Sequence, residues 1–220
     1  MRRRAAAPLP RLVAAAGLAL VLAACGGGDD ALHGVVRAEP LDVGAVALPD
    51  VTDPTLRAQG TVEDGRLVMR ASSPDRLLLV YFGFLNCPDV CPTTLADLRS
   101  ARELLSADES ARLDLAFVTV DPDRDGPAEL AAYLRHFAPQ HHAVRAEQAE
   151  LEPALDAFLA SASVEVAEDG TVDVAHSALL YAVDADGLVV VEWPFGTSAT
   201  MLAEDLSVLL ADPAVAGDVA

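Results

Sequence analysis

Cys87 and Cys91 are the residues of this chain best suited to chemistry. Two thiols with three residues between them can share a soft metal ion or form a reversible disulfide. The chain contains one other cysteine, Cys25, which follows a short apolar segment and is interpreted as a lipid attachment site, not as a partner for the pair. The chemistry of this chain is therefore expected to centre on this single pair of thiols.

The thiol pair lies between a predicted strand and a predicted helix. Residues 76–84 form a continuous apolar run, which is typical of a strand buried on both faces of a sheet. Pro92 suits the first turn of a helix, and residues 93–105 repeat leucine and alanine at helical spacing. A second buried strand is predicted at 113–120, followed by an amphipathic helix at 127–137. This order indicates parallel strands joined by right-handed crossovers.

Further elements complete the predicted domain. Asp-Gly turn signals predict hairpins over residues 60–70, 164–174 and 178–192. A short helix is predicted at 152–161 and a closing amphipathic helix at 200–210. The sum predicts an α/β fold, a thioredoxin-like sandwich that has a mixed central sheet with flanking helices and added hairpins.

The start of the chain ends in Leu22-Ala23-Ala24-Cys25, which resembles the lipobox of bacterial lipoproteins, and the alternative is an ordinary secretory cleavage nearby. Arginines and then a short apolar run, too short to span a bilayer comfortably, indicate a secretory signal. Removing its four arginines changes the formal net charge from −19 to −23, which disfavours nucleic acid as a partner. We expect a signal peptide over 1–24, a flexible tether from lipidated Cys25 over 25–49, the thioredoxin-like domain over 50–212 and a C-terminal tail over 213–220.

Three segments resemble the signature blocks of the Sco/SenC family. They are residues 81–95 (YFGFLNCPDVCPTTL), 120–125 (VDPDRD) and 175–178 (AHSA). The resemblance extends from about residue 50 to residue 210, and its first block is highly specific. It implies a thioredoxin-like fold, membrane attachment outside the cytoplasm and delivery of copper during assembly of cytochrome c oxidase.

The same resemblance implies a set of copper ligands. In the family two cysteines and a later histidine bind copper, as Cu(I) or Cu(II), which here means Cys87, Cys91 and His176. The implied partner is the copper-bearing subunit of cytochrome c oxidase, with other copper carriers or thiol reductants as further candidates. The implied location is the extracytoplasmic face of the bacterial cell membrane. The leader indicates a lipid anchor here, whereas many relatives use a transmembrane helix. Asn86 and Gly126 depart from the family pattern, which often has histidine and usually threonine there, but neither is a proposed ligand.

The residue types suit that chemistry. Soft Cu(I) prefers thiolate sulfur and accepts imidazole as a third ligand. Cys91 is expected in the first helical turn, where free backbone N–H groups and the helix dipole favour a thiolate. Four residues of separation put helical Cβ atoms roughly 5 to 6 Å apart, whereas a disulfide needs about 4 Å. We expect a pair that opens and closes with a small backbone adjustment, and the alternative is a permanent disulfide.

Other polar residues allow more than one interpretation. His176 can reach the thiols only through the fold, and a lone histidine before a strand is more often a surface or hydrogen-bonding residue. Asp121 ends a buried strand at the edge where parallel sheets place their sites, so it either orients His176 and tunes the metal site or only caps the following turn. His141 and His142 are interpreted as part of a solvated loop, and His33 as part of the tether.

Two functions use the same thiols. The leading hypothesis is a copper metallochaperone, which passes metal by ligand exchange without turnover. The alternative is a thiol-disulfide oxidoreductase, in which one cysteine attacks a target disulfide and the other resolves the mixed species, so enzyme activity stays open. A peroxidase is disfavoured because Arg99 lies on the helix beyond the thiols, and structural zinc is disfavoured because only three ligands are apparent.

Overall fold

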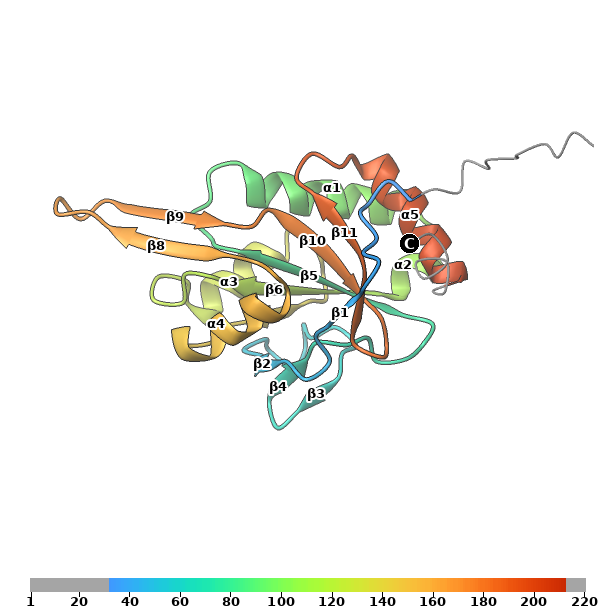
Figure 1. Cartoon of the computed structure of the whole chain (residues 1–220), viewed down its shortest axis with the longest axis horizontal. Helices are drawn as coiled ribbons and strands as arrows, with labels where there is room; N and C mark the ends of the chain where they lie inside the picture. Colours follow the sequence, from blue (N-terminus) through green and yellow to red (C-terminus); the bar gives the residue numbers. More distant parts are fainter. Residues whose placement is uncertain (1–31, 213–220) are drawn as a thin grey trace, which may run out of the picture. The chain divides into compact units, whose positions relative to one another are not determined.

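The computed structural model describes residues 32–212, and its largest sheet has six strands in the order β1-β11-β10-β5-β6-β7 (Figure 1). Strands β5, β6 and β7 run parallel, whereas β10, β11 and β1 extend the sheet beyond β5 through antiparallel pairs. The strands of this sheet are β1 (Leu41–Asp42), β5 (Leu77–Gly83), β6 (Leu113–Thr119), β7 (His142–Val144), β10 (Leu179–Val183) and β11 (Leu188–Pro194). The sheet is therefore mixed, as predicted.

The two central strands form the core because both of their faces are covered. Every residue of β5 and β6 is buried, and the strands pair in register from Leu77 opposite Leu113 to Gly83 opposite Thr119. Successive side chains of a strand point to opposite faces. Tyr81 packs against Phe117 on one face, and the next residue, Phe82, packs against Phe158 on the other.

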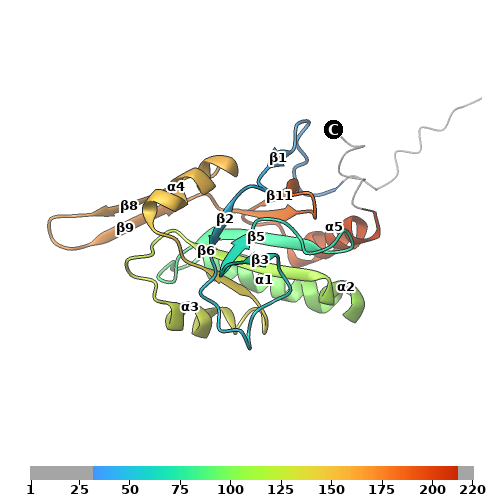
Figure 2. The same cartoon turned by 90° about the horizontal axis from the view of Figure 1, so that it is seen from below.

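The helices cover the two faces of the sheet. They are α1 (Val90–Leu104), α2 (Ala107–Ala111), α3 (Pro127–Leu134), α4 (Gln148–Ala157) and α5 (Ala199–Ala211). Figure 2 shows α4 on one side of the sheet and α1 and α3 on the other. Helix α5 packs beside α1. This arrangement confirms the predicted α/β fold with flanking helices.

Hairpins extend the domain where Asp-Gly turns were predicted. A second sheet has the order β2-β4-β3, built from Ala47–Pro49, Arg66–Val68 and Val62–Glu63. Strands β8 (Ala162–Val166) and β9 (Val172–His176) form a two-stranded hairpin that projects from the rest of the domain (Figure 1). Gly65, Gly170 and Gly187 adopt positive φ at the three turns, a conformation that costs glycine little.

The described part of the predicted tether packs on the domain. Strand β1 pairs with β11, and the side chains of Val43 and Leu48 are buried. The backbone N–H groups of His33 and Gly34 both donate to the carboxylate of Asp205 in α5. Low hydrophobic periodicity suggested a flexible segment, but a short strand can gain backbone hydrogen bonds from an open sheet edge. The remaining tether residues, the leader and the predicted C-terminal tail lie outside the described residues.

His141 and His142 are buried, so the prediction of a solvated loop is wrong. His142 opens strand β7, and its Nδ1 lies 2.9 Å from the carboxylate of Asp50. Burial alone would raise the pKa of Asp50, but hydrogen bonds from His142 and Thr52 hold that pKa below its usual value. The segment that contains Asp50 covers this edge of the sheet and closes the histidines off from solvent.

No helix within residues 32–212 combines the length and the apolar character needed to cross a membrane.

Candidate metal centre

Cys87, Cys91 and His176 come together in the folded domain. One ligand atom from each lies within 4.8 Å of the other two, and no other group of three or more His, Cys, Asp or Glu side chains among residues 32–212 is placed to hold a metal ion. The Cys91 Sγ lies 3.4 Å from the His176 Nε2. Both cysteines are free thiols in this structure. The fold thus unites residues that are 85 positions apart in the sequence.

The cysteines occupy the junction between β5 and α1. Cys91 lies in the first turn of α1, and its backbone N–H donates to the Cys87 Sγ over 3.2 Å. The side chain of the N-cap residue Asp89 makes no capping hydrogen bond. A helix start leaves backbone N–H groups without helical partners, and here the Cys87 sulfur accepts one of them. The four-residue spacing therefore works through this contact, with Cys87 ahead of the helix and not on its face.

Gly83 makes room for the buried sulfur. A Cβ added at Gly83 would lie 3.0 Å from the Cys91 Sγ and 2.9 Å from the Cε1 of Tyr81. Contacts below about 3 Å are closer than carbon atoms normally approach. The last residue of β5 must therefore lack a side chain for Cys91 to occupy this position.

His176 is held with one nitrogen toward the thiols. It is the last residue of β9, and its Nδ1 lies 3.1 Å from the backbone oxygen of Ser177. A carbonyl oxygen only accepts, so this contact assigns the proton to Nδ1 and leaves the Nε2 lone pair facing Cys91. The rings of Tyr81 and Phe84 pack against the imidazole at 84° and 83°, with centroids 6.1 and 5.7 Å away. Burial lowers the pKa of His176, which favours the neutral form that binds metals.

Two of the three candidate ligands, Cys87 and His176, line a surface groove of about 280 Å³. Cys87 and His176 are partly exposed in it, whereas Cys91 is fully buried behind them. Hydrophobic residues, including Phe84, Val90 and Val174, form much of the wall. The base of the β8–β9 hairpin lies beside the segment that joins β5 to α1 (Figure 1), so one side of the groove belongs to the hairpin. A ligand from another molecule would meet Cys87 and His176 before Cys91.

The environment of Cys91 differs from the expectation that the helix start favours its thiolate. Burial, together with the smaller effect of the hydrogen bond with Cys87, raises the pKa of the Cys91 thiol to about 12. The backbone of Phe84 and the Tyr81 side chain act in the opposite direction but do not compensate. Loss of solvation therefore outweighs the helix start at this position.

The two thiols should react at very different rates. In the reduced, metal-free protein at pH 8, we expect iodoacetamide to modify Cys87 at least about 100-fold faster than Cys91, because only the thiolate attacks and Cys91 is both buried and held neutral. The Cys91 rate should keep rising well above pH 9, where an ordinary thiol levels off. Mass spectrometry of Cys87→Ser and Cys91→Ser variants gives each rate separately. Equal rates at pH 8 would contradict this assignment.

Asp121 does not contact His176. Its buried carboxylate pairs with Arg124, and its own backbone N–H donates to the hydroxyl of Thr119. These contacts are those expected of a residue that shapes the turn after β6. An effect of Asp121 on the metal site therefore stays a prediction without a direct contact to carry it.

Asp125 is the carboxylate that reaches the thiol segment, and sequence reasoning did not single it out. It is fully buried, and its Oδ2 accepts hydrogen bonds from the backbone N–H of Leu85 at 3.0 Å and the hydroxyl of Thr119 at 2.6 Å. Burial raises its pKa. Asp125 thus ties the chain just before Cys87 to the end of β6. The signal in the sequence was its place in the second signature block.

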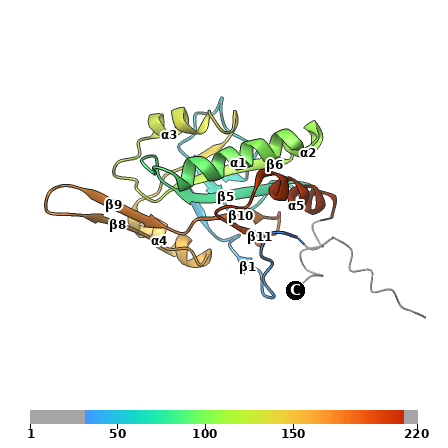
Figure 3. The same ribbon diagram turned by 90° about the horizontal axis from the view of Figure 1, so that it is seen from above.

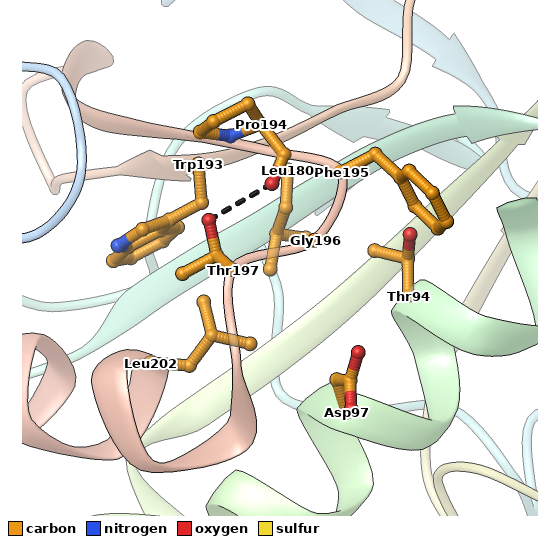
Figure 4. A pocket seen from close by; sticks show the side chains of 9 residues that line it. All are labelled: Thr94, Asp97, Leu180, Trp193, Pro194, Phe195, Gly196, Thr197 and Leu202. Atoms are coloured by element: carbon orange, nitrogen blue, oxygen red, sulfur yellow. Dashed lines mark hydrogen bonds between the residues drawn. The ribbon is translucent and has the colours of Figure 1, made fainter.

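A separate small pocket lies between α1 and the turn that leads from β11 to α5 (Figure 4). Trp193 is buried there, and its Nε1 donates to Asp205 over 2.7 Å. Phe195 is 44% exposed, and Thr94 and Asp97 of α1 line the same pocket. The lining contains no thiol or imidazole, so this pocket is distinct from the metal centre.

Comparisons with known proteins identify relatives of this chain. The sequence profile of the SCO1/SenC family matches residues 59–211. The chain is 35% identical over 131 residues to the mitochondrial Protein SCO2 homolog of Danio rerio, a match that covers 59% of this chain and 47% of the relative. This chain spans roughly half to three fifths of the length of the first curated relatives it matches.

Solved structures extend the likeness to the fold. The apo Sco1 protein from Thermus thermophilus is 27% identical and superposes with a TM-score of 0.67, covering 83% of this chain and 99% of that chain. Bradyrhizobium japonicum ScoI, solved with copper bound, is 25% identical with a TM-score of 0.57, covering 80% and 98%. Together with the profile match over most of the chain, these likenesses show that the protein belongs to the SCO1/SenC family and has its thioredoxin-like fold.

Proposed function

We propose that this protein is a copper metallochaperone that delivers copper to the dinuclear copper site of cytochrome c oxidase during assembly. The observation that carries the proposal is the convergence of the Cys87 and Cys91 thiols with the Nε2 of His176. Two sulfurs and one imidazole nitrogen form a donor set that soft Cu(I) prefers, and imidazole also suits Cu(II). The copper-bound structure of the Bradyrhizobium relative supports copper as the cargo.

The unequal burial of the ligands supports a transfer role. Cys87 and His176 face the groove, so an incoming thiolate or imidazole could replace them one at a time. Cys91 is buried and would be the last ligand to leave. Stepwise exchange avoids releasing a free ion, and it needs an acceptor surface that fits the groove beside the β8–β9 hairpin.

We also propose that the protein acts at the extracytoplasmic face of the bacterial cell membrane, anchored through a lipid on Cys25. The basic and apolar leader followed by Leu22-Ala23-Ala24-Cys25 supports this location. An anchor would keep the copper site close to a membrane-bound oxidase subunit.

The second candidate function is reduction of the acceptor's cysteines. One observation favours it: the backbone N–H of Cys91 donates to the Sγ of the partly exposed Cys87. This contact places the two thiols side by side at the start of a helix. Cys87 would attack an acceptor disulfide and release one acceptor thiol. Cys91 would then attack the Cys87 sulfur of the mixed disulfide and release the second acceptor thiol. Two electrons pass to the acceptor, which gains two thiols, and Cys87 and Cys91 end as a disulfide.

A transfer assay tests both functions. The protein, loaded with one equivalent of Cu(I), is mixed anaerobically with the soluble copper-bearing domain of an oxidase subunit, and metal analysis after separation measures transfer. We expect transfer faster than from a Cu(I)–glutathione complex at equal copper, and much slower transfer from His176→Ala. If His176→Ala instead leaves the reaction with an oxidised, copper-free acceptor unchanged and copper transfer never exceeds the glutathione control, the oxidoreductase function replaces the chaperone.

A further inference from the structure

A groove of about 370 Å³ is lined by three arginines, two of which lie on α1, the helix that contains Cys91. Arg99 and Arg102 come from the C-terminal half of α1, and Arg135 and His136 from the segment after α3. Helices α1 and α3 lie side by side on one face of the sheet (Figure 3). On α1, Arg99 and Arg102 lie eight and eleven residues after Cys91. At 1.5 Å per residue, this spacing places the groove roughly 12 to 17 Å from the metal centre.

Two of these three arginines are unusual because they lack carboxylate partners among the described residues. The chain has no lysine and an excess of acids, and every described arginine except Arg102 and Arg135 lies within salt-bridge distance of a carboxylate in residues 32–212. Both exceptions line this groove. The third arginine, Arg99, has only the exposed Glu103, at 3.8 Å. Within residues 32–212, the two arginines without a carboxylate partner thus lie in one place.

Hydrogen bonds to backbone oxygens hold two of the arginine side chains in place but leave some of their N–H donors unused. Arg99 Nη1 donates to the backbone oxygen of His136, and Arg102 Nη2 donates to that of Ser110. The Nη1 of Arg102 is buried and has no partner among the described residues. Burial lowers the pKa of Arg102, Asp114 opposes that effect and Arg76 adds to it, yet a guanidinium stays charged at neutral pH. A buried donor without an acceptor is costly, so an anion in the groove would relieve it.

We infer that this groove binds a phosphate ester. Guanidinium groups present forked donors that match phosphate oxygens, and three of them around one groove suit an anion with two or three free oxygens, as phosphate diesters and monoesters have. Phe137 and Pro139 form an apolar wall, and the volume exceeds that of a bare phosphate ion, so the organic part of the ester lies against these residues. A soluble phosphate monoester and the headgroup of an anionic lipid share this chemistry.

Substitutions that neutralise one charge at a time give the sharpest test. Glycerol 3-phosphate is titrated into the protein at low ionic strength by calorimetry. We expect saturable binding, weakened about tenfold in Arg99→Gln and in Arg135→Gln because each loses a charge-assisted hydrogen bond. Both side chains are at the surface, so the variants should fold, which circular dichroism checks. Glu103→Gln should bind more tightly, since it removes the one acid that lines the groove.

Arg70→Gln is the matched control, because it removes the same charge from an exposed arginine that pairs with Glu63 away from the groove. Flotation with phosphatidylglycerol–phosphatidylcholine vesicles and with phosphatidylcholine alone separates the two sources of phosphate. Binding that depends on anionic lipid and is lost in Arg135→Gln assigns the lipid headgroup, and binding of glycerol 3-phosphate without that dependence assigns a soluble ester. No saturable binding to either probe, or equal losses in Arg70→Gln and Arg135→Gln, would overturn the inference.

Discussion

Replacing Cys91 with serine is expected to lower Cu(I) affinity by at least about a hundredfold. Binding of Zn²⁺ to a structural site with four ligands has a free energy of about 10–16 kcal/mol, so one ligand accounts for roughly 3 kcal/mol. A hard hydroxyl cannot replace a thiolate as a ligand of a soft ion. Cys91 is also the buried ligand, and Cys87 is the only other thiol among residues 32–212. Competition against a chromophoric Cu(I) chelator under anaerobic conditions measures the affinity.

The other ligands should rank below it in a defined order. Cys87→Ser also removes a thiolate and should cost a similar factor, whereas His176→Ala leaves two thiolates within reach of the ion and should cost less. Asp108→Asn is the control, because this exposed carboxylate of α2 pairs with Arg112 and contacts none of the ligands. An affinity of Cys91→Ser within threefold of the wild type, or a loss in Asp108→Asn as large as in His176→Ala, would contradict the assigned ligand set.

Sequence patterns predicted the parts of the fold that depend on local residue types. The apolar run at 76–84 predicted β5, which is Leu77–Gly83, and the helical spacing after Pro92 predicted most of α1. Asp-Gly turns identified the three hairpins because positive φ strongly favours glycine. These features are fixed by neighbours in the sequence, so a single sequence contains the information.

The errors come from features set by tertiary contacts. Helix α4 begins at Gln148, ahead of the predicted start, and continues through Pro153, a residue that usually marks a helix boundary. Strand β7 was missed because its three residues form a strand only by pairing with β6. The buried histidines of that region depend on the cover that the segment around Asp50 provides. None of these contacts leaves a periodic pattern.

The metal site was predictable in identity but not in electrostatics. The spacing of Cys87 and Cys91 indicated soft-metal or redox chemistry, and only the family resemblance added His176. Distance to solvent is a property of the folded domain, so the raised pKa of Cys91 and the contact of Asp125 with the thiol segment could not be predicted from local sequence. The close packing around Gly83 could not be predicted from local sequence either, because its neighbours Tyr81, Cys91 and Phe117 belong to β5, α1 and β6.

Replacing Gly83 with alanine should damage both stability and copper binding although the residue is not a ligand. An added Cβ would lie 2.9 Å from the Tyr81 Cε1 and 3.0 Å from both the Cys91 Sγ and the Phe117 Cε2. All three neighbours are fully buried, so none can move aside into solvent. Overpacking of a tight core typically costs about 1–3 kcal/mol, which corresponds to a fall in Tm of roughly 2–10 °C for a domain of this size.

Copper affinity should fall with stability because the atom that must yield is a ligand. A displacement of the Cys91 sulfur by a few tenths of an ångström would disturb its placement relative to His176, which lies only 3.4 Å away. Gly126→Ala is the matched control, since its added Cβ would meet only the end of the flexible Glu129 side chain. Calorimetric unfolding and chelator competition measure the two effects. Equal Tm and equal affinity in Gly83→Ala and Gly126→Ala would show that the space beside Cys91 is not limiting.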